Sequence, residues 1–128
     1  MDEGRKKHIA IIDDDQLVRE GLTDCLESAE YSVEAFDSAE AFLRSDTARL
    51  AACLILDVQL PGMTGLELQD RLAEVSERTP IVFVTAHSTD ANRERAIRRG
   101  AAGFLSKPFR REELLEAITT ALHRRGNV

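Results

Sequence analysis

The chain has 128 residues, which is enough for one domain around a single buried core. Apolar residues make up 43% of the sequence and charged residues 31%, a composition that excludes a disordered tail, a membrane span and a fibrous repeat. Seventeen basic and twenty-three acidic residues give a net charge of −6, so we expect no direct binding of nucleic acid by this domain.

The N-terminal segment and the cysteines indicate where the protein resides. Residues 1–8 are polar and charged and lack the apolar stretch of a secretory signal. Cys25 and Cys53 stand far apart in apolar surroundings, without the spacing of metal ligands, and are expected to be reduced thiols of the core. These features predict a cytoplasmic protein without membrane contact.

Short apolar runs alternate with segments of helical period along the whole chain. The runs predict five strands, at residues 8–12, 31–36, 53–56, 81–84 and 102–105. Apolar residues at helical spacing predict helices at 18–29, 68–75, 89–99 and 114–122. One further helix is expected after the second strand, where Asp37 followed by Glu40 resembles a capping box, and Gly100 is expected to end the helix at 89–99.

The alternation predicts a single doubly wound α/β domain with a parallel sheet and right-handed crossovers. The first, third and fourth strands are almost continuously hydrophobic, as expected of parallel strands covered on both faces. The second strand alternates apolar and polar residues, which places it at an edge of the sheet.

Polar side chains follow four of the predicted strands, and such strand ends are where open α/β sheets bind ligands. Residues 13–15 are all aspartate, Asp57 follows the third strand, Thr85 the fourth and Lys107 the fifth. If these strands are neighbours, three carboxylates, one hydroxyl and one ammonium group meet at one end of the sheet.

Each residue also has an ordinary structural interpretation. Asp15 or Asp57 alone could be a helix N-cap. Thr85 could simply fill space in the sheet, and Lys107 could be a solvated loop lysine. The pair at 61–62, Pro-Gly, is by itself only a type II turn. The joint occurrence of all these groups favours a functional site.

The charges of this cluster point to a metal ion. Asp13, Asp14 and Asp57 carry three negative charges against one positive charge on Lys107, and close carboxylates repel one another or take up protons. A divalent cation would balance the excess, and oxygen ligands with room for water suit Mg²⁺. The chemistry that follows is phosphoryl transfer to a carboxylate, with Mg²⁺ and Lys107 neutralising the phosphoryl oxygens.

From about residue 7 to residue 122 the sequence closely resembles the response-regulator receiver domain of two-component signalling. The matching segments are IAIIDDDQLVREGL, LILDVQLPGMTGLELQ, VFVTAH and GAAGFLSKPF, in the order and spacing of that family. The segments LPGMTGLELQ and TAH most closely resemble the corresponding segments of the FixJ-type subgroup of transcriptional regulators. The resemblance implies a flavodoxin-like (βα)5 fold with strand order 2-1-3-4-5.

The resemblance also implies a role for each matching residue. Asp57 is the phosphoacceptor, Asp14 ligates Mg²⁺ directly, and Asp13 helps through water or a second contact. The main-chain carbonyl of Gln59 is a further metal ligand. Three more residues follow the family pattern: Thr85 as the switch hydroxyl, Lys107 as the lysine that pairs with the phosphoryl group, and Pro108 after a cis peptide bond.

Two positions depart from the family pattern. The aromatic switch residue is Phe104 rather than the commoner tyrosine, so only burial of the ring can report the state of the domain. The segment 88–90 is Ser-Thr-Asp, where the subgroup commonly has Gly-Asp after the histidine. His87 itself is interpreted as a residue of the pocket rim rather than a catalytic group.

The resemblance implies that a sensor histidine kinase phosphorylates the domain, which acts on no substrate other than its own phosphoryl group. Residues 1–128 are expected to form the receiver, with a transcriptional output domain outside this chain. Phosphorylation is expected to favour a homodimer through the fourth helix, fifth strand and fifth helix, with arginines of one protomer facing glutamates of its partner: Arg93, Arg95, Arg98 and Arg99 against Glu112, Glu113 and Glu116.

Three other functions are compatible with the predicted fold. A flavodoxin-like FMN carrier needs a phosphate-binding loop after the first strand, where this chain has three aspartates. A haloacid-dehalogenase-type phosphatase needs a second acid two residues after its nucleophile, where this chain has Gln59. A phosphorylation-independent pseudo-receiver, acting only as an interaction module, predicts a broken acid cluster or a missing lysine.

Overall fold

The structure is a computed structural model that describes residues 6–46, 50–74 and 79–126. In these residues five strands alternate with five helices: β1 His8–Ile12, α1 Gln16–Ser28, β2 Ser32–Phe36, α2 Ala39–Arg44, β3 Cys53–Leu56, α3 Gly65–Glu74, β4 Ile81–Thr85, α4 Asp90–Arg98, β5 Gly103–Ser106 and α5 Arg111–Gly126. All predicted elements are present with small shifts at their ends. The predicted end of the third helix at Val75 lies outside the described residues.

The strands form one parallel sheet in the order β2-β1-β3-β4-β5, which confirms the flavodoxin-like (βα)5 fold. The predicted edge position of β2 is confirmed, and β5 is the other edge. Main-chain hydrogen bonds continue past the strand ends, from the Asp57 amide to the Ile12 carbonyl at 3.0 Å and from the Lys107 amide to the Thr85 carbonyl at 2.9 Å. The residues that follow β1, β3, β4 and β5 are therefore held side by side.

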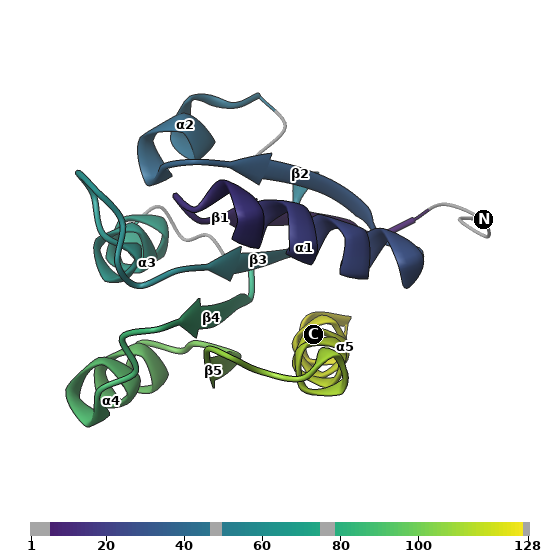
Figure 1. The fold of residues 1–128 in the computed structure, drawn as a ribbon. Coiled ribbons are helices and arrows are strands. Elements are labelled where there is room, and N and C mark those ends of the chain that lie inside the picture. The colour runs from purple at the N-terminus through teal and green to yellow at the C-terminus, as the bar shows by residue number, and fades with distance from the viewer. Residues whose placement is uncertain (1–5, 47–49, 75–78, 127–128) are drawn as a thin grey trace.

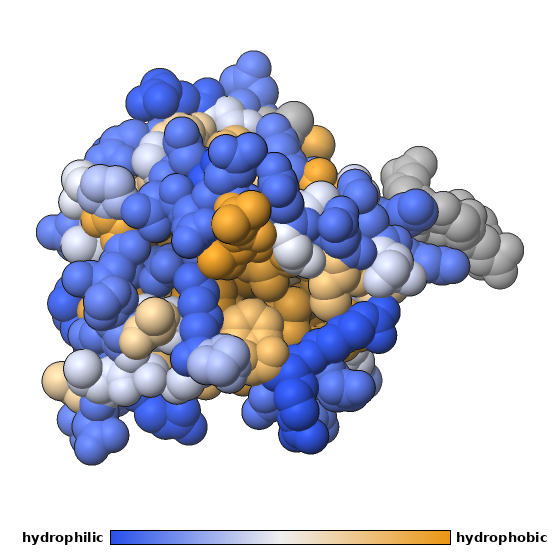
Figure 2. Space-filling view, in the orientation of Figure 1, coloured by the Kyte–Doolittle hydropathy of each residue, from blue (hydrophilic) through white to orange (hydrophobic). Residues whose placement is uncertain are grey.

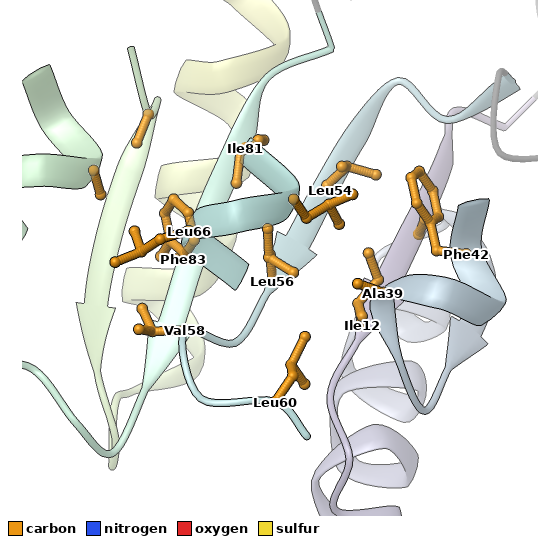
Figure 3. Close-up of a cluster of buried hydrophobic side chains, with 14 of the residues drawn as sticks. Ile12, Ala39, Phe42, Leu54, Leu56, Val58, Leu60, Leu66, Ile81 and Phe83 are labelled. Carbon is orange, nitrogen blue, oxygen red and sulfur yellow. The ribbon is translucent and has the colours of Figure 1, made fainter. Parts of the chain in front are cut away.

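Helices cover both faces of the sheet (Figure 1). On one face α1 and α5 bury long aliphatic side chains, including Leu26 and Ile118, against β1, β3 and β4. On the other face α2, α3 and α4 close a second cluster, and Figure 3 shows Phe42 of α2 and Leu66 of α3 among its side chains. Strand β3 is fully buried between the two clusters.

Local hydrogen bonds set where the helices begin. The Asp15 carboxylate caps α1 by accepting from the Leu17 amide at 2.9 Å, which confirms the N-cap interpretation for this aspartate. Asp57 caps no helix, because α3 begins only at Gly65. The ordinary interpretation therefore applies to the first aspartate and is wrong for the second.

The predicted capping box of α2 is wrong. Ser38, not Asp37, is the N-cap, and its hydroxyl accepts from the Ala41 amide at 3.0 Å. The Glu40 carboxylate reaches away from its own helix to the Met63 amide, at 2.8 Å. A glutamate three residues after a polar residue predicts a capping box only when no neighbouring hydroxyl caps the helix better.

A capping box is instead present at the start of α3. Thr64 Oγ1 accepts from the Glu67 amide at 3.1 Å, and Glu67 Oε1 accepts from the Thr64 amide at 2.9 Å. Helix α4 is capped by the Thr89 hydroxyl and is followed by Gly100 with φ 98°, as predicted for the glycine that ends it. The helices that flank the site are thus defined largely by local sequence.

The thiols and the helix lengths bear on two further expectations. Cys53 is a buried core residue outside any disulfide, as predicted, whereas Cys25, also outside any disulfide, is only partly buried. None of the described helices combines the length and the apolar character needed to cross a membrane.

Candidate functional site

Three carboxylates meet at the carboxyl end of the sheet. Asp13 and Asp14 follow β1, and Asp57 follows β3. One oxygen from each carboxylate lies within 4.8 Å of the other two. Asp13 is fully buried and Asp57 is 6% exposed, whereas Asp14 is exposed, so the cluster has a buried base and an open mouth.

Backbone amides hold the two buried carboxylates. Asp13 Oδ1 accepts from the Asp15 amide at 2.9 Å, and Asp57 Oδ1 accepts from the Gln59 amide at 3.0 Å. Both contacts are made by the residue two positions later, as in an Asx turn. Each turn uses one oxygen and leaves the other, Oδ2, for the ammonium group of Lys107.

Lys107 reaches the cluster from the end of β5. Its Nζ donates to Asp13 Oδ2 at 2.8 Å and to Asp57 Oδ2 at 3.2 Å, and its side chain is 20% exposed. Lys107 is therefore not a solvated loop lysine. The following peptide bond, Lys107–Pro108, is cis, as the resemblance implied.

Burial and neighbouring charges shift two ionisable groups. Burial is the main cause that raises the pKa of the Asp57 carboxyl, and the Asp13 charge adds to it, although the Gln59 amide and the Lys107 ammonium act in the opposite direction. Burial also disfavours the charge on Lys107, but the hydrogen bond to Asp13 and the Asp57 charge outweigh it and raise the pKa of the ammonium group. The surroundings therefore favour the charged form of Lys107 and disfavour the charged form of Asp57.

Thr85 and Phe104 lie on the β4–β5 side of the site. Thr85 is fully buried, and its Oγ1 accepts from the His87 amide at 3.0 Å. The Phe104 ring is 7% exposed and lies 6.0 Å from the Phe83 ring, centroid to centroid, with the Arg93 guanidinium 6.0 Å above its centroid. In this structure the ring of Phe104 is part of the core.

Two residues that support the carboxylates were missed by the sequence reasoning. A Cβ added to Gly65 would lie 2.1 Å from the Asp57 carbonyl oxygen, so only glycine allows α3 to start against the residue that follows β3. Arg19 donates from Nη1 to the Asp13 carbonyl at 2.8 Å. The glycine directly before the helical period of α3 was the available signal for the first, whereas the arginine contact needed the tertiary structure.

The arginines of α4 differ from the sequence expectation. Arg95 Nη2 lies 2.8 Å from Asp70 Oδ2 on α3, and Arg99 Nη1 pairs with the other oxygen of the same carboxylate. These two side chains pair with an acid of their own chain, a contact that the sequence did not indicate. Arg98 makes only a long contact, 3.8 Å, to Glu94 on its own helix.

The donor set of the cluster fits a hard divalent cation. All three candidate ligands are carboxylates, their oxygens converge, and Asp14 opens the cluster to water. Hard cations of this kind prefer oxygen ligands and retain water. Gln59, whose main-chain carbonyl was predicted as a further ligand, is exposed. Its main-chain amide donates to the Asp57 carboxylate, so the residue lies next to the cluster.

Comparisons with known proteins agree with this arrangement. Residues 9–119 match the family described as the response regulator receiver domain. The response regulator protein TodT of Pseudomonas putida is 45% identical over 118 residues, which are 92% of this chain and 52% of that protein. The transcriptional regulatory protein FixJ of Bradyrhizobium diazoefficiens is 37% identical over 117 residues, which are 91% of this chain and 57% of that protein. The chain thus spans about half the length of the curated relatives it matches.

A solved structure gives the same result in three dimensions. The response regulator StyR superposes with a TM-score of 0.85 at 43% identity, over 95% of this chain and 62% of that one. The match selects a receiver over the flavin carrier and the phosphatase that the fold alone allowed, and the similarity to FixJ agrees with the predicted subgroup. This chain belongs to the response regulator receiver domain family.

Proposed function

We propose that this receiver accepts a phosphoryl group on Asp57 from the phosphohistidine of a sensor histidine kinase, with Mg²⁺ held at the acid cluster. The observation that carries the proposal is the contact of one ammonium group, Lys107 Nζ, with both Asp13 and Asp57 beside the exposed Asp14. In this arrangement the buried Asp57 carboxylate has an ammonium group and two possible metal-binding carboxylates as neighbours.

The cluster carries three negative charges and one positive charge when all its groups are ionised. Asp13, Asp14, Asp57 and the Gln59 carbonyl would hold the cation. A bound Mg²⁺ supplies charge neutralisation for the phosphoryl oxygens. Such an ion would also oppose the burial and the neighbouring Asp13 charge, which together raise the pKa of Asp57, and so favour the ionised carboxylate.

Transfer to Asp57 is a substitution at phosphorus. A carboxylate oxygen of Asp57 forms the new O–P bond while the P–N bond to the donor imidazole breaks, and the electron pair of that bond stays on the imidazole nitrogen. Lys107 moves its hydrogen bonds from the free carboxylate to a phosphoryl oxygen, since its Nζ already lies 3.2 Å from Asp57 Oδ2. The domain acts on no other substrate and catalyses only the gain and loss of its own phosphoryl group.

Thr85 and Phe104 connect the site to the α4 side of the molecule. The Thr85 hydroxyl accepts from His87, which leaves its proton available to a phosphoryl oxygen. A new bond there favours one packing of Thr85 and of the Phe104 ring over another, because a ligand shifts an equilibrium only by the contacts that differ between two states. Phe104 has no hydroxyl, so the position of its ring is the signal.

An apolar groove beside the site suits the kinase. Figure 2 shows apolar side chains gathered at the surface between α1 and α5. Leu17 is 78% exposed there, and the groove also has Cys25, Phe109 and Lys107 in its lining. Exposed apolar patches of this kind are typical of protein interaction sites, and Lys107, whose ammonium group contacts Asp57, is among the residues that line this one.

The output is transcriptional, through a domain outside this chain. The support is the similarity to FixJ, a transcriptional regulatory protein of which this chain covers 57%. The acidic receiver itself makes no nucleic-acid contact, since its net charge is −6.

Phosphorylation favours a homodimer through α4, β5 and α5. Asp70 pairs with Arg95 and Arg99, whereas α4 also presents Arg98, 68% exposed, beside Ile97, 48% exposed. Arg93 on the same helix is exposed as well. Light scattering after beryllofluoride treatment should show dimers that Arg98→Glu weakens and Arg44→Glu, on α2, leaves unchanged. An activated wild-type domain that stays monomeric at high concentration and low salt contradicts the dimer.

Intact-mass analysis after treatment with acetyl phosphate and Mg²⁺ tests the function. Wild type should gain one phosphoryl group, and Asp57→Asn should gain none, because an amide cannot form the acyl phosphate. Asp24→Asn, which changes an exposed aspartate of α1, is the matched control and should be labelled like wild type.

Two outcomes of that experiment would count against the proposal. Full labelling of Asp57→Asn would show that another residue is the acceptor. Wild type that stays unlabelled, both with acetyl phosphate and with a phosphorylated kinase, would favour the pseudo-receiver, which binds its partners without phosphorylation.

A further inference from the structure

The loop between β3 and α3, residues 57–64, carries both Asp57 and the proposed ligand Gln59. Its base is closed by a hydrogen bond from the Gly65 amide to the Val58 carbonyl, at 3.0 Å. Within it, the side chains of Val58 and Leu60 are buried, 3% and 7% exposed. At the other end of the loop the Met63 side chain is partly buried and packs against the core, and the backbone of Gly62 and Met63 has a further anchor.

Glu40 provides that anchor from α2. Its Oε2 accepts from the Met63 amide at 2.8 Å, a contact across 23 residues of sequence. Figure 1 shows the loop that leaves β3 extending from the end of the sheet toward α2. The Met63 amide and then the amide of Glu40 itself lower the pKa of this carboxyl, so the acceptor is an ionised carboxylate at neutral pH.

The backbone of Gly62 packs against the same carboxylate. It has φ 75°, and a Cβ added to it would lie 2.6 Å from Glu40 Oε2. The carboxylate therefore lies directly against the glycine backbone, in a space that any side chain at position 62 would fill. The turn conformation and the carboxylate contact are matched to each other.

We infer that Glu40 is a positioning residue of the cation site. Its hydrogen bond to Met63 restrains this end of the loop, and together with the Val58–Gly65 closure it limits the backbone positions open to Gln59, whose carbonyl the proposed function assigns to Mg²⁺. The inference rests on that proposed function. Groups that orient metal ligands from behind commonly change metal affinity by about tenfold or more when they are removed.

Glu40→Ala and Glu40→Gln separate the hydrogen bond from the charge. Both variants remove one negative charge, but only glutamine keeps an oxygen that can accept from the Met63 amide. The Mg²⁺ dissociation constant, from backbone amide shifts of the whole chain in a magnesium titration, should rise about tenfold in Glu40→Ala and stay near wild type in Glu40→Gln. Glu94→Ala, which removes an exposed charge on α4, should also stay near wild type.

Hydrogen exchange without metal provides a readout that does not depend on Mg²⁺. The Met63 amide should exchange about tenfold faster in Glu40→Ala than in wild type and in Glu40→Gln, because its acceptor is lost. A Glu40→Ala variant with wild-type magnesium affinity overturns the inference. Equal weakening in both variants also overturns it, because the effect would then come from charge.

The same titration distinguishes this inference from the proposed function. If wild type shows no magnesium-dependent shifts near Asp14 and Asp57, the cation site itself is wrong, and the role of Glu40 toward it is wrong as well. If wild type binds Mg²⁺ there and Glu40→Ala binds it equally well, only the role of Glu40 is wrong.

Discussion

The layer formed by α1 and α5 and the region formed by the site, α3 and α4 are held together by different forces. In the first, Leu22, Leu26 and Ile118 pack apolar surface against the sheet. In the second, α3 also buries Leu66 and Leu68 in the core, but α4 buries only Ala96 and is linked to α3 by ion pairs to Asp70. Apolar packing responds little to charge, whereas ion pairs and hydrogen bonds do. A change of charge on Asp57 should therefore affect the position of α4 more than that of α1 or α5.

One of the polar side chains that contact α4 has only part of its hydrogen-bonding capacity used among the described residues. Gln69 of α3 is buried and donates from Nε2 to the Ala96 carbonyl at 3.0 Å. In the part of the chain that the structure describes, its Oε1 has no hydrogen-bond partner. An unpaired buried oxygen costs about 1–3 kcal/mol. Polar contacts therefore hold α4 in place, and a small displacement of the helix could replace them with other polar contacts. The apolar packing of α5 offers no such exchange.

The largest expected effect is in the apolar layer. Ile118→Ala should lower the free energy of unfolding by about 3–4 kcal/mol, because it leaves a cavity under a fully buried side chain. Ala96→Gly, the corresponding test in α4, should cost only about 1 kcal/mol, mainly through helix propensity. Urea unfolding followed by circular dichroism measures both. Equal losses would contradict the difference between the regions.

The next effect has the opposite sign. Without Mg²⁺, Asp57→Asn should raise the free energy of unfolding by about 1 kcal/mol, because it removes a buried charge from an acidic cluster. Asp24→Asn is the control and should change little. A thermal melt in which Asp57→Asn is less stable than wild type would contradict this prediction.

The pH dependence of that effect follows from the raised pKa of Asp57. The folded chain binds this proton more tightly than the unfolded chain, so the contribution of Asp57 to stability declines as pH rises from about 4 through the folded pKa. The advantage of Asp57→Asn should therefore be absent below about pH 4 and should grow as the pH rises through the folded pKa of Asp57. Unfolding curves at several pH values measure it, and a constant difference would contradict the assignment.

A smaller effect is expected where α3 meets α4. Asp70→Asn should cost about 0.5–1 kcal/mol at low salt, because Arg95 and Arg99 lose their shared carboxylate and repel each other one turn apart. High salt should reduce the loss. Hydrogen exchange should rise in α4 and stay unchanged in α5, and faster exchange in both helices would contradict separate regions.

The smallest effect is expected at the outer surface of α4. Glu94→Gln removes a pair to Arg98 of 3.8 Å between side chains that are 80% and 68% exposed. Such pairs contribute about 0.3 kcal/mol or less. Urea unfolding should barely separate this variant from wild type. A loss as large as that of Asp70→Asn would show that exposure does not distinguish the two contacts.

Much of the site could be predicted from the sequence because its groups occupy strand ends. Asp57 and Lys107 each follow an apolar run, and parallel strands bring their carboxyl ends to one edge. Glu40 and Asp70 could not be predicted in this way. Both are polar residues of amphipathic helices, where the expected environment is water, and their partners lie 23 or more residues away.

The sequence by itself determined the elements, the edge position of β2 and the acid–lysine constellation, because periodicity and strand-end chemistry are local properties that tertiary contacts reinforce. Only the tertiary structure decided which atoms the carboxylates contact, within that constellation and outside it. Asp13 and Asp57 converge on Lys107, while Asp70 takes two arginines and Glu40 takes a backbone amide. These side chains are paired with groups that the fold brings within about 3 Å of them, although those groups are distant in sequence.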